Sequence, residues 1–288
     1  MLAHDPLDGV AAQPQIAIAD DDRIGIGASR RRVWLDECSS PLQNNLPRGT
    51  SARDLMTLMN TTEKRQGSPD SGSLSNRLRH VYWIGRGSGA GKSTIARRLA
   101  TEHGLQCYST DDAMADHGRR CRPGDCPFLT EFQKMSMDER WVNRSPQTML
   151  ETFHWFRGEG FGLIVEDLLK LPPDKGVIVE GFRLLPQLVK PLLHDSSHGV
   201  WLIPTPEFRL AAFESRGSLW SIAERTSNPA RALNNLLERD RLFTAFLRDI
   251  TEEAGLPVID VDSLMTESVL EARVATLFGL PSGPELRP

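Results

Sequence analysis

The chain has 288 residues, of which 39% are hydrophobic and 25% are charged, and its formal net charge at pH 7 is −4. These values suit a globular protein with one α/β domain of about 200 residues and an appendage. The slightly negative charge gives no reason to expect a nucleic-acid partner. No apolar stretch approaches the ~20 residues of a membrane-spanning helix, so we expect no membrane partner.

The start of the chain and its cysteines predict a cellular compartment. Residues 1–22 contain neither the basic region nor the apolar region of a secretory signal. Four cysteines in a chain of this length do not indicate a disulfide framework. We therefore expect a cytoplasmic, reduced protein.

Residues 1–75 have the composition of a flexible extension. They mix Asp, Gly, Ser, Pro and Gln with short apolar pieces, and GSPDSGSLS at 67–75 is typical of a linker. We expect this extension to be mostly disordered, with brief strands at Ile16–Ile18 and Ile24–Ile26 and a helix over Ser51–Lys64. A regulatory or docking arm is the alternative. Residues 76–288 form the predicted folded domain.

A phosphate-binding loop is predicted within residues 81–98, VYWIGRGSGAGKSTIARR. An apolar run of strand type, Val81–Ile84, leads into a Gly-rich loop, and Lys92-Ser93-Thr94 opens an apolar-periodic helix. Glycines let backbone N–H groups converge on phosphate oxygens, and the helix N-terminus adds partial positive charge. Lys92 is expected to reach the β- and γ-phosphates and act in catalysis, and the Ser93 hydroxyl to ligate Mg²⁺. The predicted nucleotide-binding residues are Gly87, Ser88, Gly89, Ala90, Gly91, Lys92, Ser93 and Thr94.

One position departs from this loop pattern. Where G-x-x-x-x-G-K-S has its first glycine, the chain has Arg86, between Gly85 and Gly87. An arginine strains the turn if a positive φ is required there, whereas the flanking glycines are able to absorb the turn. Both outcomes remain open at this point.

A second strand, Leu105–Tyr108, leads to two adjacent carboxylates, Asp111 and Asp112. They fall at the predicted carboxyl edge of a parallel sheet, where ligands bind in open α/β sheets. A carboxylate there accepts the proton of a substrate hydroxyl during phosphoryl transfer, or holds the substrate in line. Asp111 is the predicted catalytic residue and Asp112 a predicted substrate contact. The alternative is that either residue only caps the next helix.

Residues 113–170, approximately, are predicted as a helical, substrate-binding insertion between the second and third strands. Ser145-Pro146 is a good helix start, and Arg157 is a candidate for substrate contact. Phe153, Trp155 and Phe156 are better explained as core residues than as a stacking platform. A zinc site is disfavoured because the spacing is too loose between its candidate ligands, Cys107, His117, Cys121 and Cys126.

The apolar run over residues 176–179, followed by Glu180 and Gly181, is typical of a buried central parallel strand. This strand brings Glu180 beside the phosphate loop, in the Walker B position, where a carboxylate holds Mg²⁺ through water or orients a substrate. A solvent-facing acid at a strand end is the alternative. Arg183 follows and is expected to contact an anionic group of the substrate.

The rest of the chain continues the alternation of strands and helices. Strands are predicted at Gly199–Pro204 and Pro257–Val261, and helices at Pro186–Leu193, Pro206–Ser215, from Pro229 to Gly255 and at Thr266–Phe278. Arginines after the fourth strand are placed to form a lid, over about residues 205–250, that clamps a phosphoryl group. Arg239 is the preferred phosphate contact and a predicted catalytic residue, and Arg216 is the second choice and a predicted substrate contact. A plain charged helix face is the alternative. The predicted fold class is α/β, a five-stranded parallel sheet with helices on both faces.

Four segments, in this order, resemble the nucleoside and nucleotide kinase branch of P-loop proteins: GSGAGKST at 87–94, STDD at 109–112, VIVEG at 177–181 and ERD at 238–240. The resemblance covers about residues 79–280, and the chain is similar to uncharacterised actinobacterial P-loop proteins described as kinase-like or ATP-binding. It implies a P-loop NTPase fold with ATP as the nucleotide. It also implies that Lys92 and Ser93 bind the triphosphate and Mg²⁺, that Asp111 handles the acceptor and that Arg239 belongs to the lid.

The leading hypothesis is an Mg²⁺-dependent kinase that transfers the γ-phosphoryl group of ATP to a hydroxyl or phosphate of a small acceptor. A nucleoside, a nucleotide or a similar metabolite fits this class, and the protein is expected to be a monomer or homodimer. A nucleoside monophosphate demands arginines within residues 119–157, whereas a nucleoside, sugar or antibiotic does not. The main alternative is a nucleotide-binding switch that hydrolyses slowly or not at all, which Arg86 and the first 75 residues favour. A toxin-like kinase acting on activated sugars is a third hypothesis.

Overall fold

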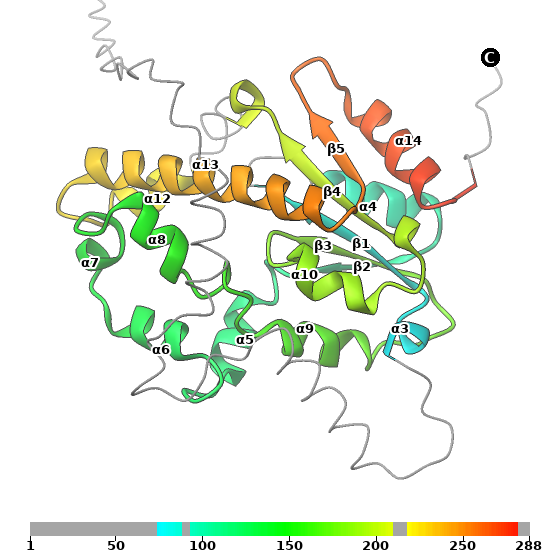
Figure 1. Ribbon diagram of the computed structural model, residues 1–288, viewed down its shortest axis with the longest axis horizontal. Helices are drawn as coiled ribbons and strands as arrows, with labels where there is room; N and C mark the ends of the chain where they lie inside the picture. The colour runs from blue at the N-terminus through cyan, green and yellow to red at the C-terminus, as the bar shows by residue number, and fades with distance from the viewer. Residues whose placement is uncertain (1–73, 88–92, 210–217, 282–288) are drawn as a thin grey trace, which may run out of the picture. The chain divides into compact units, whose positions relative to one another are not determined.

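A sheet of five parallel strands organises the domain (Figure 1). The computed structural model describes residues 74–87, 93–209 and 218–281. The strand order is β2-β3-β1-β4-β5, with β1 at Val81–Arg86, β2 at Gln106–Ser109, β3 at Val177–Gly181, β4 at Gly199–Pro204 and β5 at Val258–Val261. Every neighbouring pair runs parallel, so the carboxyl ends of the strands meet at one edge. The predicted α/β class and parallel sheet are confirmed.

Helices connect the strands and surround the sheet. Those of the first half are α3 (Leu74–Arg77), α4 (Ser93–Glu102), α5 (Met114–Arg120), α6 (Pro127–Lys134), α7 (Met137–Trp141), α8 (Pro146–Thr152) and α9 (Phe161–Leu168). Those of the second half are α10 (Pro186–Val189), the 3₁₀ turns η2 (Lys190–Leu192) and η3 (Ser196–His198), α12 (Ser218–Ala223), α13 (Pro229–Glu253) and α14 (Glu267–Leu277).

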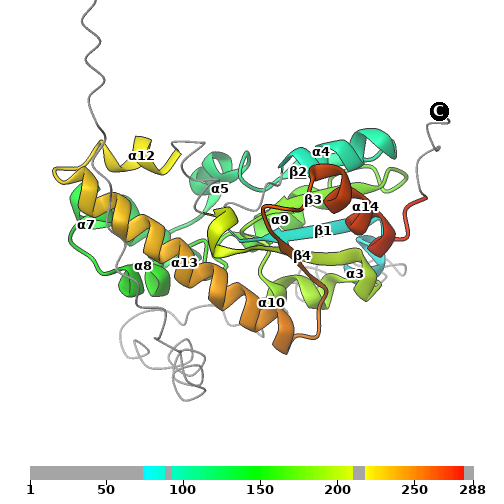
Figure 2. The ribbon, with the colours of Figure 1, turned by 90° about the horizontal axis from the view of Figure 1, so that it is seen from above.

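Alternate residues of the strands face two separate hydrophobic cores, one on each side of the sheet. In β3, Val177 and Val179 belong to one core and Ile178 to the other, and all three are completely buried. The first core includes side chains of α9, α10 and α13, and the second includes side chains of α4 and α14 (Figure 2). A central parallel strand covered on both faces has no solvent-facing residue, which explains its continuous apolar run. Helices on both faces are therefore confirmed.

The segment between β2 and β3 is helical, as predicted, and its helices have defined starts. Ser145 caps α8, because its hydroxyl oxygen accepts a hydrogen bond from the Thr148 N–H at 3.0 Å, and Pro146 stands in the first turn. Ser136 and Glu139 form a capping box at the start of α7. These caps stop each short helix from running into the next one, and so fix the turns of the insertion.

Helix α13 connects the insertion to the sheet (Figure 1). Its 25 residues span about 37 Å. In its first half Leu236 belongs to a hydrophobic cluster with residues of α7, α8 and α12. In its second half Phe243 is buried in the core of the sheet, and its ring stacks on Phe156 with centroids 3.8 Å apart. The segment predicted as a lid thus contains α12 and most of α13, and its lid function stays a prediction.

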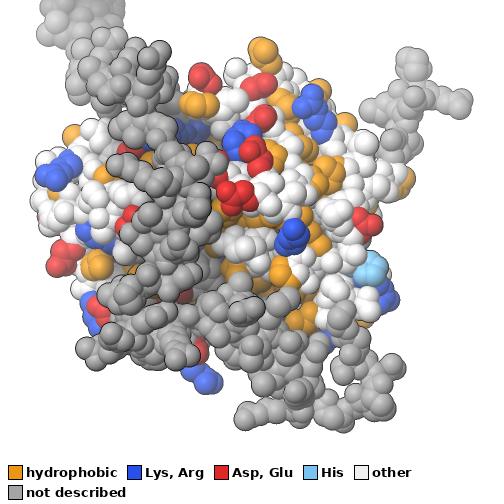
Figure 3. Space-filling view, in the orientation of Figure 1, with side chains coloured by type: hydrophobic (Ala, Val, Ile, Leu, Met, Phe, Trp, Pro, Cys, Tyr) orange, Lys and Arg blue, Asp and Glu red, His pale blue; other side chains and the backbone are white. Residues whose placement is uncertain are grey.

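Several predictions about the ends and loops concern residues that are not described. The extension at residues 1–73 and the segment 210–217 lie outside the described ranges, while residues 206–209 are helical, as expected. Leu74 begins α3, so the last two residues of the predicted linker belong to a helix. Across the described ranges, no helix combines the length and apolar character that crossing a membrane requires. On the face in Figure 3, Lys and Arg side chains are interspersed with Asp and Glu.

Candidate functional site

Strand β1 leads directly into the predicted phosphate loop. Gly87, the residue after β1, donates its N–H to the Leu202 backbone oxygen at 3.0 Å. A Cβ at Gly87 would lie 2.9 Å from Pro204 and 3.0 Å from Thr244, so a larger residue would displace β4 or α13. The predicted nucleotide contacts Ser88, Gly89, Ala90, Gly91 and Lys92 lie outside the described residues. Ser93 begins α4, and Thr94 follows with an exposed side chain.

Two carboxylates meet at the carboxyl ends of β2 and β3, next to the end of β1. Glu180 pairs in register with Ile84 of β1, and Asp111 follows β2 by two residues. Arg86 joins them: its Nε donates to Glu180 Oε2 at 3.0 Å, and a terminal nitrogen donates to Asp111 Oδ2. The exposed fractions of the three side chains are 7% for Arg86, 1% for Glu180 and 31% for Asp111. The arginine that departs from the loop pattern therefore bridges the two acids predicted as functional.

Asp111 has the surroundings of a general base. Burial raises its pKa above the ordinary value of an aspartate, against the opposing effect of the Arg86 guanidinium, and the Glu180 carboxylate raises it further. Its Oδ1 atom is buried and accepts no hydrogen bond within the described part of the chain, and the Thr110 hydroxyl is likewise unpaired. A buried oxygen left in this state costs about 1–3 kcal/mol. A ligand that donates a hydrogen bond to Asp111 Oδ1 would recover that free energy.

Gly181 makes room for these unpaired oxygens. Its φ is 149°, which lies in the region that favours glycine. A Cβ there would collide with the Thr110 hydroxyl and lie 3.3 Å from Asp111 Oδ1. The space that a side chain would take at Gly181 is therefore occupied by Thr110, which follows β2.

The acids at this edge of the sheet fit a hard cation such as Mg²⁺. Carboxylate oxygens are the ligands that Mg²⁺ prefers, and it commonly binds one or two of them together with the phosphates of a nucleotide. Asp111 Oδ1 accepts no hydrogen bond from the residues that the structure describes. Among the described residues no group of three or more His, Cys, Asp or Glu forms a metal site. The assignment of Ser93 and Glu180 as metal ligands stays a prediction.

Arg183, predicted to contact the substrate, is 1% exposed and lies in a buried polar network. Its guanidinium donates to His117 Nδ1 at 2.8 Å and to the backbone oxygens of Thr110 and Gly160 at 3.3 and 3.2 Å. Because arginine only donates, His117 accepts at Nδ1, and its Nε2–H donates to Asp167 at 2.8 Å. Burial lowers the pKa of His117, which agrees with this neutral form. The network fixes the turn after β2 against α9, and a substrate contact by Arg183 stays a prediction.

The other predicted substrate contacts have different surroundings. Arg239 is 7% exposed, and two of its nitrogens donate to Asp240 Oδ1 at 2.8 and 2.6 Å. Arg157 donates to a backbone oxygen of α8 at 3.0 Å. Asp112 has an exposed side chain, 3.9 Å from a guanidinium nitrogen of α4. Arg216 lies outside the described residues, and the roles of all four stay predictions.

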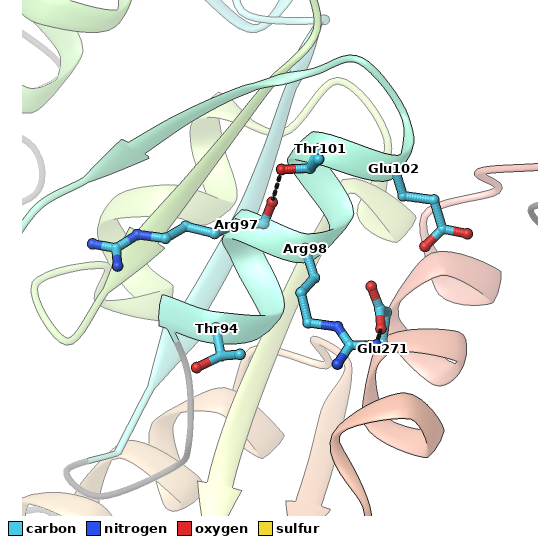
Figure 4. Close-up of a pocket in the computed structure, with 6 residues that line it drawn as sticks. All are labelled: Thr94, Arg97, Arg98, Thr101, Glu102 and Glu271. Atoms are coloured by element: carbon cyan, nitrogen blue, oxygen red, sulfur yellow. Dashed lines mark hydrogen bonds and ion pairs between the residues drawn. The ribbon is translucent and has the colours of Figure 1, made fainter.

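A recess of about 500 Å³ lies between α4 and α14 (Figure 4). Its lining includes Arg98 and Glu271, which point toward each other and form an ion pair at 2.6 Å, whereas Arg97 points away. The paired charges join the two helices. The recess therefore has a structural explanation and is not the candidate site.

No family model matches the chain, and no curated protein matches it. Among solved structures, the crystal structure of an uncharacterized protein from Eubacterium ventriosum ATCC 27560 is similar to it, with 14% sequence identity and a TM-score of 0.37. The match covers 70% of this chain and 98% of the other. A likeness this low supports no inference, and the site is interpreted from its own geometry.

The role of Arg86 is what sequence reasoning missed. The loop pattern presents this residue as a problem of turn geometry, but Arg86 is the last residue of β1 and has strand backbone, so no turn is strained there. Its side chain is buried with Glu180. The signal in the sequence was a single cation at the end of an apolar strand, together with the acids Glu180 and Asp111 at or just after the ends of two other predicted strands. A buried charge requires such a partner.

Proposed function

We propose that this protein is an Mg²⁺-dependent phosphotransferase that transfers the γ-phosphoryl group of ATP to a small-molecule acceptor. The observation that carries this proposal is the meeting of Asp111 and Glu180 beside the end of β1, the strand that leads into GSGAGKST. Phosphates bound by that loop would lie near a general base and a second acid at the same sheet edge. The acceptor and the nucleotide would thus meet at the sheet edge where Asp111 and Glu180 lie.

Each residue has a role that follows from its surroundings. Asp111 would accept the proton of the acceptor hydroxyl, because no described residue donates to its Oδ1 and its raised pKa makes it a stronger base than an ordinary aspartate. Ser93 and Glu180 would hold Mg²⁺, which when bound neutralises charge on the transferring phosphoryl group. Lys92 would stabilise the same charge from the loop. Arg86 would keep both acids in place with a fixed positive charge.

Acceptor-dependent formation of ADP tests the proposal. The purified protein is incubated with ATP and Mg²⁺ against separate pools of nucleosides, nucleoside monophosphates, sugars and aminoglycosides. We expect one pool to give ADP, Lys92→Ala to abolish that turnover, and Asp111→Asn to lower kcat more than ATP affinity. Asp116→Asn, a change of an exposed acid on α5, is the matched control. Turnover retained in Lys92→Ala would refute the assignment, and an unchanged kcat in Asp111→Asn would remove Asp111 from the mechanism.

The pairing of Arg86 with both acids favours a second candidate, a nucleotide-binding switch with slow or no hydrolysis. Both carboxylates already have a counter-charge without any nucleotide or metal, which reduces their need for one. A switch would bind ATP but form no acceptor-dependent ADP. Deleting residues 1–73, which leaves α3 intact, separates the candidates further, because a kinase would keep its turnover whereas a switch that signals through this arm would lose its partner.

A further inference from the structure

A cavity of about 300 Å³, at the lower end of the range for small-molecule sites, lies between the insertion and α13. Two of the residues that line it follow Asp111 and Glu180 closely in the chain. Met114 lines it, and the Met114 N–H donates to the backbone oxygen of Asp111 at 3.1 Å. Phe182 lines it two residues after Glu180. An occupant of this cavity is therefore adjacent to the proposed catalytic edge.

Aromatic rings form most of the wall around a histidine. His154 is 3% exposed, and the centroid of its ring lies 4.9 Å from that of Phe132, 4.6 Å from Phe153 and 4.5 Å from Trp155. Its Nδ1 atom is buried and has no hydrogen-bond partner in the described ranges. Native structures rarely leave such an atom unpaired without a reason. Burial, helped by nearby arginines, lowers the pKa of His154 to about 3, so the imidazole is neutral at physiological pH.

The charged groups at the cavity are paired with each other. The Arg239 guanidinium lies 5.0 Å from the centroid of the Phe153 ring, and its charge is balanced by Asp240. The nearby arginines of the insertion donate hydrogen bonds to backbone oxygens. Arg140 donates to two of them at 3.0 Å, and Arg144 donates to one at 3.2 Å. Among the described residues, the cavity therefore has flat apolar walls and the neutral imidazole of His154, which do not favour a phosphate group.

We propose that this cavity binds the uncharged planar ring of the phosphoryl acceptor, with His154 Nδ1 making the hydrogen bond that orients the ring. This inference rests on the proposed function, because it names the acceptor of that same site. The acceptor is then an aromatic compound, preferably a heterocycle with a hydrogen-bonding edge, that carries an alcohol group toward Asp111. A sugar without an aromatic ring does not belong to this class of acceptor, and neither does a nucleoside monophosphate.

Binding measured by calorimetry without ATP tests the inference separately from catalysis. The probes are adenosine, uridine and pyridoxine, which are uncharged ring compounds with alcohol groups, against ribose, which lacks an aromatic ring, and AMP, which carries a phosphate. We expect at least one ring compound to bind, and ribose and AMP to bind at least about tenfold more weakly. Loss of one neutral hydrogen bond in His154→Phe should weaken the binding about tenfold.

Two further variants keep the test decisive. Ile222→Phe enlarges a half-buried side chain at the cavity and should weaken binding even if His154→Phe folds poorly. His198→Phe is the matched control, since His198 Nδ1 also has no partner among the described residues, but the His198 ring lies 4.5 Å from that of Tyr82, outside this cavity. Binding of no ring compound, equal binding by wild type and both cavity variants, or a preference for ribose or AMP would overturn the inference. Ring binding without ADP formation would reject only the proposed function, whereas turnover of an acceptor without a ring would reject only this inference.

Discussion

Replacing Arg86 with methionine is the sharpest test of the electrostatics at the sheet edge. Arg86 is the cation that the described residues place between Asp111 and Glu180. Methionine has a similar reach and a flexible apolar chain that fills irregular space. The substitution therefore removes the charge and its hydrogen bonds while leaving little empty volume.

The expected cost follows from the burial of the pair. The Arg86 and Glu180 side chains are 7% and 1% exposed, and removing one partner of a buried ion pair costs about 3–5 kcal/mol. The contact with Asp111, whose side chain is 31% exposed, adds less because solvent screens it. A natural domain has about 5–15 kcal/mol of unfolding free energy. We therefore expect the variant to remain folded but to be clearly destabilised at neutral pH.

The cost should depend on pH. Burial already raises the pKa of Asp111, and Arg86 is the main group that opposes this rise. Without Arg86 the folded-state pKa rises further above the unfolded value of about 3.9. A carboxyl group of this kind contributes stability that is fully present below its unfolded pKa and is lost as pH rises through its folded pKa. The destabilisation should therefore shrink as pH falls toward 4, by about 1.4 kcal/mol per pH unit for each proton that the folded variant retains.

Urea unfolding followed by tryptophan fluorescence measures this effect, because Trp83 and Trp201 are completely buried. Wild type and variant are compared at about pH 5 and pH 7.5, and the destabilisation should be smaller at the lower pH, which is closer to the unfolded pKa of the carboxyl group. Arg119→Met on α5 is the matched control: Arg119 is 73% exposed and pairs with Asp116, which is 51% exposed, so its loss should leave the unfolding free energy nearly unchanged at both pH values. A penalty for Arg86→Met below about 1 kcal/mol, or one independent of pH, would refute the reasoning.

Three further changes test the packing and charges around the site. Burial alone would raise the pKa of Asp167, but the hydrogen bonds it receives outweigh burial and hold the pKa below its usual value. Stability from such a group is present above the unfolded pKa and is lost as pH falls through the folded pKa. Asp167→Asn should therefore lower the unfolding free energy by about 1.5–3 kcal/mol at pH 7, and by less in acid. Urea unfolding at the two pH values measures the difference. Gly85→Ala should cost about 1–3 kcal/mol because its Cβ would collide with the Trp201 indole, whereas Gly162→Ala in α9, where the Cβ meets open space, should be neutral or stabilising. Ser145→Ala should lower the unfolding free energy by about 1 kcal/mol through loss of the α8 cap, and an unchanged urea midpoint would contradict that role.

The strands were predictable because a buried strand has apolar residues at consecutive positions of the sequence. The run over residues 177–179 is apolar at every position, and both cores of the sheet need it to be so. The placement of Glu180 beside β1 was also predicted, from the apolar run that ends in this acid, and the pairing of β1 with β3 confirms that the two strands are neighbours. Helix starts such as Ser145 follow from two adjacent residues. These features depend on short windows of sequence.

The bridge made by Arg86 could not be predicted in the same way. Its partners Glu180 and Asp111 are 94 and 25 residues away along the chain, and only the register of three strands brings them together. The aromatic residues of the insertion show a similar limit. Trp155 and Phe156 were predicted as core and are 6% and 3% exposed, which confirms that prediction. The same rings also line the cavity, because hydrophobic periodicity does not distinguish a filled core from one that contains a hollow.

The position of Arg86 also bears on how the two proposed functions differ physically. A guanidinium fixed between Asp111 and Glu180 lowers the affinity of these acids for a free cation, because the cation must share them with a permanent charge. Phosphate oxygens would offset that repulsion, so metal and nucleotide should bind better together than either does alone. A kinase and a switch would share this property, since both depend on the bound nucleotide. They differ only in whether the unpaired oxygen of Asp111 meets an acceptor hydroxyl, and the adjacent aromatic cavity is where that acceptor would be held.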